Sequence, residues 1–132
     1  MHCHLREPGF EFKETVATGC AAAVKGGITS LMCMANTDPV NDRASVTAYI
    51  LEKASEANLA RVYPVGSVTR GMEGESLSEM GELADAGCIA VSDDGHPVES
   101  GEVMRRAIRY AGAFGMFVID HAEDLKLSLI HI

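Results

Sequence analysis

The chain has 132 residues, of which 47% are hydrophobic and 23% are charged, so its size and composition suit one globular domain with a real core. Its 11 basic and 19 acidic residues give a net charge of −8 without any cluster of Lys and Arg, which argues against nucleic acid or an anionic membrane as the main partner. No apolar run approaches the roughly 20 residues of a membrane span and no signal segment opens the sequence, so we expect a cytoplasmic protein.

The first predicted element is a short extended segment that contains His2-Cys3-His4 and ends in a turn at Arg6–Gly9. Residues two apart share one face of a strand, so both imidazoles point the same way and form a half-site for a divalent transition metal such as zinc. Arg6 would lie on that face if the strand persisted, and a guanidinium beside a metal favours an anionic substrate. Alternation sends Cys3 to the opposite face, which favours packing over metal ligation. The other cysteines have no CxxC spacing and are expected to be reduced and mostly buried: Cys20, Cys33 and Cys88.

Hydrophobic periodicity predicts helices that alternate with four further strands. The helices are expected over Lys13–Lys25, Arg43–Ala57, Glu75–Ala86 and Gly101–Phe114, and the strands over Ile28–Met34, Arg61–Ser67, Cys88–Ser92 and Met116–Asp120. We expect Asp42 or Asn41 to cap the second helix, and Pro64 is unusual in a strand because it donates no ladder hydrogen bond. This alternation is typical of right-handed βαβ units around a parallel sheet. The predicted fold class is α/β, with a partial barrel and a flat doubly wound sheet both still open.

Polar side chains collect where the predicted strands end. They comprise His2, His4 and Arg6 after the first strand, Asn36 after the second, Asp93-Asp94 after the fourth, and His121 and Glu123 after the fifth. The carboxyl ends of the strands carry the active site in (β/α)8 barrels. Singly, Asp93-Asp94-Gly95 could be only a turn, Asn36 a loop cap and His121 a strand-end histidine. Together with the HxH pair, the set favours a metal site.

Zinc accepts a His, His, Asp, His set and leaves a position for water, which then becomes a nucleophile near neutral pH. This chemistry supports hydrolysis of an amide or a related bond. Arg6 and Asn36 would hold a carboxylate or a ring carbonyl of the substrate.

Four segments in chain order resemble the successive motifs of class I dihydroorotases, in the metal-dependent amidohydrolase superfamily. They are HCHLREPGFEFKET, GGITSLMCMANTDPVND, AVSDDGHPV and IDHAED. The resemblance covers nearly all of residues 1–124 and implies about the first five βα units of a (β/α)8 barrel, not closed. The activity it implies is the reversible interconversion of L-dihydroorotate and N-carbamoyl-L-aspartate in pyrimidine biosynthesis.

The same resemblance implies roles for individual residues. The metal ligands would be His2, His4, Asp94 and His121, which would bind one or two zinc ions, with Asp94 shared where related enzymes use a carboxylated lysine. The substrate contacts would be His4, Arg6 and Asn36, with Arg6 on the substrate carboxylate. The implied partners are the small-molecule substrate, a second copy in a homodimer and aspartate carbamoyltransferase.

The chain also departs from the family's pattern. Ala35 replaces the proline of the family's MPNT and Ala122 replaces the cysteine of HCED, although Asn36 and His121 remain in place. The family's later histidine ligand and its general-base aspartate would follow the fifth strand, so we expect residues 1–126 to be an incomplete barrel without a catalytic residue and inactive alone. Residues 127–132 do not continue the pattern and are expected to be a foreign or frame-shifted tail, in which His131 is no ligand.

Two alternative functions remain open. Another cyclic amidase, such as an allantoinase or a hydantoinase, is less consistent with Asn36-Thr37-Asp38-Pro39 and with the lack of a lysine at the bridging position. A non-catalytic, dihydroorotase-like scaffold for aspartate carbamoyltransferase would be expected to lose metal ligands, whereas this sequence keeps every ligand that the segment could hold.

Overall fold

The computed structural model describes residues 1–127 and contains a single row of five parallel strands. The strands are β1 (His2–Cys3), β2 (Ser30–Cys33), β3 (Arg61–Gly66), β4 (Ala90–Val91) and β5 (Phe117–Val118). Their order in space follows their order in the chain, and all four neighbouring pairs are parallel. A doubly wound sheet would reverse its strand order at a switch point. The fold is therefore an open partial barrel and not a doubly wound sheet. This confirms the predicted α/β class.

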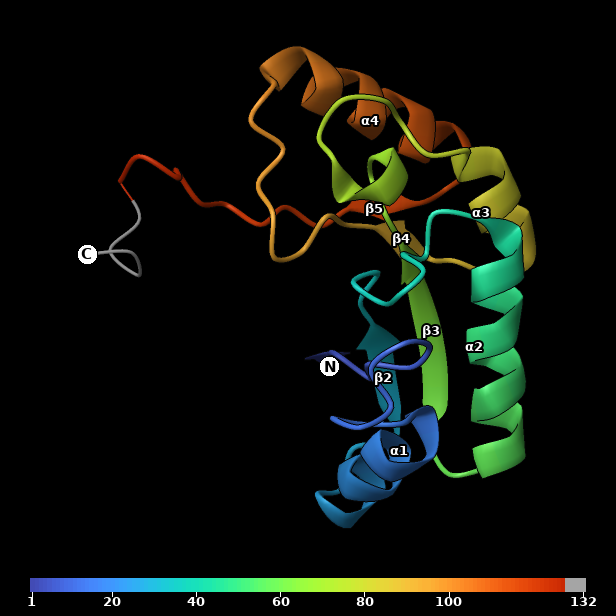
Figure 1. The fold of residues 1–132 in the computed structure, drawn as a ribbon. Coiled ribbons are helices and arrows are strands. Elements are labelled where there is room, and N and C mark those ends of the chain that lie inside the picture. The colour runs from blue at the N-terminus through green and yellow to red at the C-terminus, as the bar shows by residue number, and fades with distance from the viewer. Residues whose placement is uncertain (128–132) are drawn as a thin grey trace.

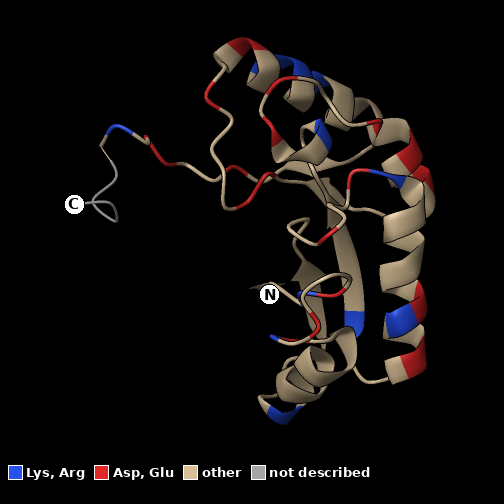
Figure 2. Cartoon of the chain, in the orientation of Figure 1, with Lys and Arg blue, Asp and Glu red and all other residues tan. Residues whose placement is uncertain are grey.

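The helices form a curved layer on one side of the strands (Figure 1). They are α1 (Val16–Lys25), α2 (Ala44–Ala57), α3 (Met80–Ala86) and α4 (Gly101–Ala113), with a short 3-10 turn, η1 (Arg70–Met72), after β3. Each α-helix contacts the next one along the chain. Charged residues lie mainly on the helices and loops, and Arg61 is the one charged residue within the strands of residues 1–127 (Figure 2). None of the helices in this part of the chain is long and apolar enough to cross a membrane.

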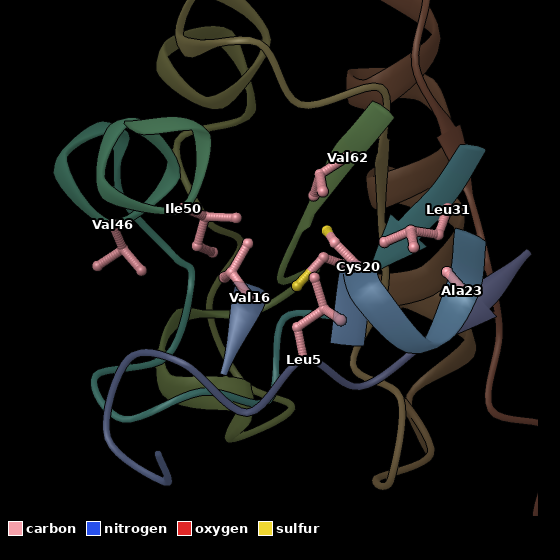
Figure 3. Close-up of a cluster of buried hydrophobic side chains, with 9 residues drawn as sticks. Leu5, Val16, Cys20, Ala23, Leu31, Val46, Ile50 and Val62 are labelled. Atoms are coloured by element: carbon pink, nitrogen blue, oxygen red, sulfur yellow. The ribbon is translucent and has the colours of Figure 1, made fainter. Parts of the chain in front are cut away.

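Apolar side chains fill the space between the strands and the helix layer. One cluster lies under α1 and α2 (Figure 3) and contains Leu5, Val16, Cys20, Ala23, Leu31, Cys33, Val46, Ile50 and Val62. A second lies under α3 and α4, and a third, smaller cluster contains Met34, Val65 and Ala90. Because successive strand residues point to opposite faces, Val65 packs away from the side on which Val62 meets the helices. Strands buried on both faces are typical of parallel sheets.

The helix starts depend on contacts that the sequence pattern did not predict. Thr15 caps α1 in a capping box with Thr18, so the helix begins three residues later than expected. The prediction that Asp42 or Asn41 caps α2 is wrong, because Arg43 holds the N-cap position without a side-chain bond. Asn41 is instead fully buried, where its amide donates to the Val65 carbonyl at 3.0 Å.

The third helix is shorter than predicted. Residues 75–79 form no helix, because Leu77 bridges Thr69 in an antiparallel pair and the Ser78 N–H donates to the Val68 carbonyl at 3.0 Å. Tertiary pairing outweighs the helical periodicity of this segment. The apolar periodicity of α4 predicts that Ala107, Ile108 and Ala111 face inward. Ala107 and Ala111 are buried, but Ile108 is 56% exposed, so this part of the prediction is wrong.

Two remaining expectations concern single residue types. Pro64 lies within β3, where its carbonyl still accepts the Ile89 N–H at 3.2 Å, so one missing donor is tolerated. All four cysteines are free; three are buried and Cys3 is half-buried, and burial raises the pKa of the Cys33 thiol to about 12. Apart from Leu127, the predicted tail over residues 127–132, including His131, lies outside the described residues.

Candidate functional site

The four predicted metal ligands meet at the carboxyl ends of three strands. His2 in β1 and His4 just after it have their Nε2 atoms 3.4 Å apart, as their spacing predicted. Asp94 follows β4, and its Oδ2 atom is 2.8 Å from His2 Nε2 and 3.1 Å from His4 Nε2. His121 follows β5 and approaches the other carboxylate oxygen, with Nδ1 3.0 Å from Oδ1. One carboxylate therefore joins all three histidines.

Neighbouring side chains fix the orientation of two of these rings. His4 Nδ1 lies 2.9 Å from the carbonyl oxygen of Asn36, which follows β2. A carbonyl oxygen only accepts, so His4 Nδ1 donates to Asn36 and Nε2 faces Asp94 and His2. His121 Nε2 lies 3.1 Å from a carboxylate oxygen of Glu123. This arrangement, in which a second group sets the tautomer, is common among metal-binding histidines.

The Asp94 carboxylate and the His121 imidazole shift each other's pKa. Burial acts to raise the pKa of Asp94, but hydrogen bonds from His121 and His2 and the nearby imidazoles outweigh it and hold the pKa below its usual value. The hydrogen bond to Glu123 raises the pKa of His121 above its usual value; burial opposes this, and the Asp94 hydrogen bond adds to it. Imidazole nitrogen atoms and the Asp94 carboxylate oxygens thus converge on one point.

The geometry of this group fits a divalent transition metal. One ligand atom from each of His2, His4 and Asp94 lies within 4.8 Å of the other two. Ligands at a tetrahedral zinc ion are about 2.0–2.2 Å from the metal and so about 3.3 Å from one another. The separation of 3.4 Å between the histidine nitrogens matches this value, while the carboxylate sits closer, at hydrogen-bond distance. The site could accept zinc with only a small outward shift of Asp94.

Asp93 has a different role from its neighbour. It is 3% exposed, and its Oδ1 accepts the N–H groups of Val68 at 2.7 Å and Thr69 at 3.1 Å, while its Oδ2 accepts the Thr69 hydroxyl. Burial raises the pKa of Asp93, and these hydrogen bonds offset the effect only in part. The end of β3, which had no predicted contribution, supplies the donors that hold the loop carrying Asp94. The family resemblance assigned Asp94 to the metal site, but no local pattern in the sequence shows that Asp93 is buried.

Replacing Asp93 by alanine should strongly destabilise the protein. Two backbone N–H groups and one hydroxyl would be left buried without an acceptor, and we expect the free energy of unfolding of the 132-residue chain to fall by about 3–5 kcal/mol. Urea unfolding followed by circular dichroism measures the change. Asp85→Ala, on the exposed surface of α3, is the matched control and should change the free energy by less than about 0.5 kcal/mol. Equal losses for the two variants would contradict the assigned role.

The predicted substrate residues are His4, Asn36 and Arg6, and they differ in their hydrogen bonds. His4 and Asn36 are joined directly by their hydrogen bond. Arg6 is partly buried, and within residues 1–127 its side chain forms no hydrogen bond or ion pair. Its backbone φ is +63°, a left-handed value that sequence reasoning did not predict. Glu7, which flanks it, was also missed, since no sequence pattern marks it as a buried carboxylate.

An open row of parallel βα units with histidines and a carboxylate at the carboxyl ends of its strands defines the class of α/β-barrel proteins that bind ligands at this face. Residues 1–128 match the sequence profile of a family described as "Dihydro-orotase-like", and the chain belongs to this family. Among similar curated proteins, the dihydroorotase of Syntrophotalea carbinolica is 55% identical over 127 residues and that of Geobacter sulfurreducens is 58% identical over 127 residues. The dihydroorotase of Anaeromyxobacter dehalogenans is 59% identical over 127 residues. These matches cover 96% of the chain, which spans 29–30% of the length of the relatives.

Proposed function

We propose that this chain supplies the metal-binding part of a dihydroorotase, a hydrolase that reversibly opens the cyclic amide of L-dihydroorotate to N-carbamoyl-L-aspartate in pyrimidine biosynthesis. The observation that carries the proposal is the Asp94 carboxylate, which contacts His2 and His4 through one oxygen and His121 through the other. The identity of 55–59% to curated dihydroorotases over nearly the whole chain supports this activity over another cyclic amidase.

In this proposal, zinc is held by residues from three strand ends. His2, His4 and one oxygen of Asp94 would bind the first ion, and His121 with the other oxygen would bind a second. Zinc bound here would polarise a carbonyl oxygen and lower the pKa of a water molecule. Asn36 keeps the Nε2 lone pair of His4 directed at the ion, and Glu123 orients His121 in the same way. The presence and clustering of these ligands favour an enzyme over a scaffold that has lost its metal.

Arg6 and Asn36 would bind the substrate. The guanidinium of Arg6 offers paired N–H donors that suit a carboxylate, and the side-chain nitrogen of Asn36 can donate to a second substrate oxygen. No residue of 1–127 is proposed as the general base, a role that the resemblance assigns to a later segment of the family. Besides the substrate, the proposed partners are a second copy of the protein and aspartate carbamoyltransferase.

A hybrid enzyme tests the proposal directly. Residues 1–127 would replace the matching segment of the Geobacter sulfurreducens dihydroorotase, to which this chain is 58% identical. We expect zinc to copurify with the hybrid and its kcat/KM for L-dihydroorotate to lie within about tenfold of that of the parent enzyme. Ring opening of dihydroorotate, ring closure of N-carbamoyl-L-aspartate, and turnover of allantoin and hydantoin would be measured together.

A second hybrid controls for the junctions. It carries the matching segment of the Syntrophotalea carbinolica dihydroorotase, joined at the same positions. If this control is active while the test hybrid lacks dihydroorotate turnover, the proposed function is wrong. Turnover of allantoin or hydantoin alone would indicate another cyclic amidase. A metal-free test hybrid that copurifies with aspartate carbamoyltransferase would indicate the scaffold function instead.

A further inference from the structure

The backbone at Arg6 forms an unusual turn. The Glu7 N–H donates to the Leu5 carbonyl at 2.8 Å, which closes a three-residue turn with Arg6 at its centre, and the φ of Arg6 is +63°. A γ-turn with a positive central φ is rare and strained in a residue that carries a Cβ atom. Strained conformations of this kind persist only where the surrounding structure holds the flanking residues. The contacts that fix Leu5 and Glu7, on either side of Arg6, therefore determine the direction of the Arg6 side chain.

Leu5 anchors one side of the turn. Its side chain is 2% exposed and points into the cluster between α1, α2 and the strands, close to Val16 and Cys20 (Figure 3). A Cβ atom added to Gly19 of α1 would lie only 2.4 Å from a methyl carbon of Leu5, so the helix backbone approaches this side chain closely. Leu5 cannot leave its place without opening the core.

Glu7 anchors the other side of the turn. It is 8% exposed, and its Oε2 atom accepts the Val16 N–H at the start of α1 at 2.7 Å. Its Oε1 atom accepts the Tyr49 hydroxyl of α2 at 3.1 Å. These donors, together with the partial positive charge at the N-terminus of α1, offset the cost of burying the carboxylate. Both oxygens of Glu7 are thus bound to the helix layer.

The side chain of Arg6 is not fixed to the helix layer, unlike the side chains of Leu5 and Glu7. It is partly buried but has no hydrogen-bond or ion-pair partner among residues 1–127, whereas Leu5 and Glu7 are both fixed to the helices. A guanidinium whose N–H donors have no acceptor among residues 1–127 suits the carboxylate of a bound ligand. The two anchors restrict the backbone and leave the charged group available.

We propose that Glu7 is a positioning residue: by tying the turn to α1 and α2, it directs Arg6 toward the substrate carboxylate without touching the substrate itself. The inference rests on the proposed function, in which Arg6 binds that carboxylate. Without the Glu7 carboxylate, the turn can relax toward a negative φ, and the direction in which the Arg6 side chain leaves the backbone changes. The effect should fall on substrate binding and leave the chemical step nearly intact.

The test uses variants of the active hybrid described above. Glu7→Ala should raise the KM for L-dihydroorotate at least about tenfold while kcat changes less than about threefold and the zinc content is unchanged. Glu7→Gln should stay within about threefold of the unmodified hybrid, because its side-chain oxygen can still accept the Val16 N–H and its amide can donate to the Tyr49 oxygen. Glu11→Ala is the matched control: Glu11 accepts the Gly9 N–H at 2.9 Å in the same loop but is exposed, and no change is expected.

A double-mutant cycle with Arg6 separates positioning from general destabilisation. In an Arg6→Ala background, Glu7→Ala should raise the KM less than about twofold further, since the side chain that it positions is gone. Additive effects, or a loss in kcat at constant KM, would overturn the inference. If Glu7→Ala does not fold, Tyr49→Phe takes its place with an expected rise in KM of about threefold, and an unchanged KM overturns the inference. Failure of the proposed function is a separate outcome, since it appears as lack of turnover in the unmodified hybrid.

Discussion

Asp94→Ala in the hybrid enzyme is expected to abolish ring opening, with a fall in kcat/KM of at least about 10³-fold. The reason is geometric, because this one carboxylate contacts His2 and His4 through Oδ2 and His121 through Oδ1. Its removal would take a ligand from each of the two proposed metal positions and a carboxylate from beside the three imidazoles. The initial rate of dihydroorotate hydrolysis and the zinc content after dialysis would be measured in parallel, and both should fall.

The control for this experiment is Asp85→Ala, which removes an exposed carboxylate of α3 that lies outside the proposed site. It should leave both zinc content and turnover unchanged. Circular dichroism on each variant checks that the fold is retained. Normal turnover in Asp94→Ala would refute the assignment of Asp94 as the shared ligand, and loss of turnover with full zinc content would place Asp94 in substrate binding instead.

Gly9→Ala is expected to destabilise the 132-residue chain by about 3–5 kcal/mol. The φ of Gly9 is +98°, and an added Cβ atom would lie 2.2 Å from the carbonyl oxygen and 2.6 Å from the Cβ atom of Asp38. Neither atom can easily move away, because the Asp38 N–H also donates to the Pro8 carbonyl at 3.0 Å. Urea unfolding would measure the loss. This close approach holds the loop after Arg6 against the loop after Asn36.

Gly27→Ala provides the matched comparison. Its φ of +79° carries the same conformational penalty, but nothing lies within 4 Å of an added Cβ atom. We therefore expect a loss of only about 1 kcal/mol, from backbone strain alone. If the two variants lost equal stability, the contact between the Gly9 and Asp38 loops would have no energetic importance.

Most of the fold could be predicted from local sequence patterns. The alternation of short apolar runs with amphipathic segments predicted the five strands and the four α-helices of residues 1–127, although not the short η1 turn. Strand and helix periodicities depend on neighbouring residues only. The predictions failed where residues that are distant in the sequence form hydrogen bonds with each other in place of the expected local ones. Ser78 pairs with Val68 and so delays the start of α3, and Asn41 turns inward to Val65 and does not cap α2.

The candidate site shows the same division between local and distant information. The sequence by itself determined the α/β class and the shared face of His2 and His4, because a strand places residues two apart on one side. The family resemblance indicated that Asp94 meets His2 from 92 positions away, and the structure places the two side chains together. Only the tertiary structure decided that Asp93 turns inward to Thr69 and that Glu7 is buried against α1 and α2. Adjacent aspartates are indistinguishable in a local pattern. In the folded chain Asp93 is buried against Val68 and Thr69 at the end of β3, and Asp94 faces the histidines.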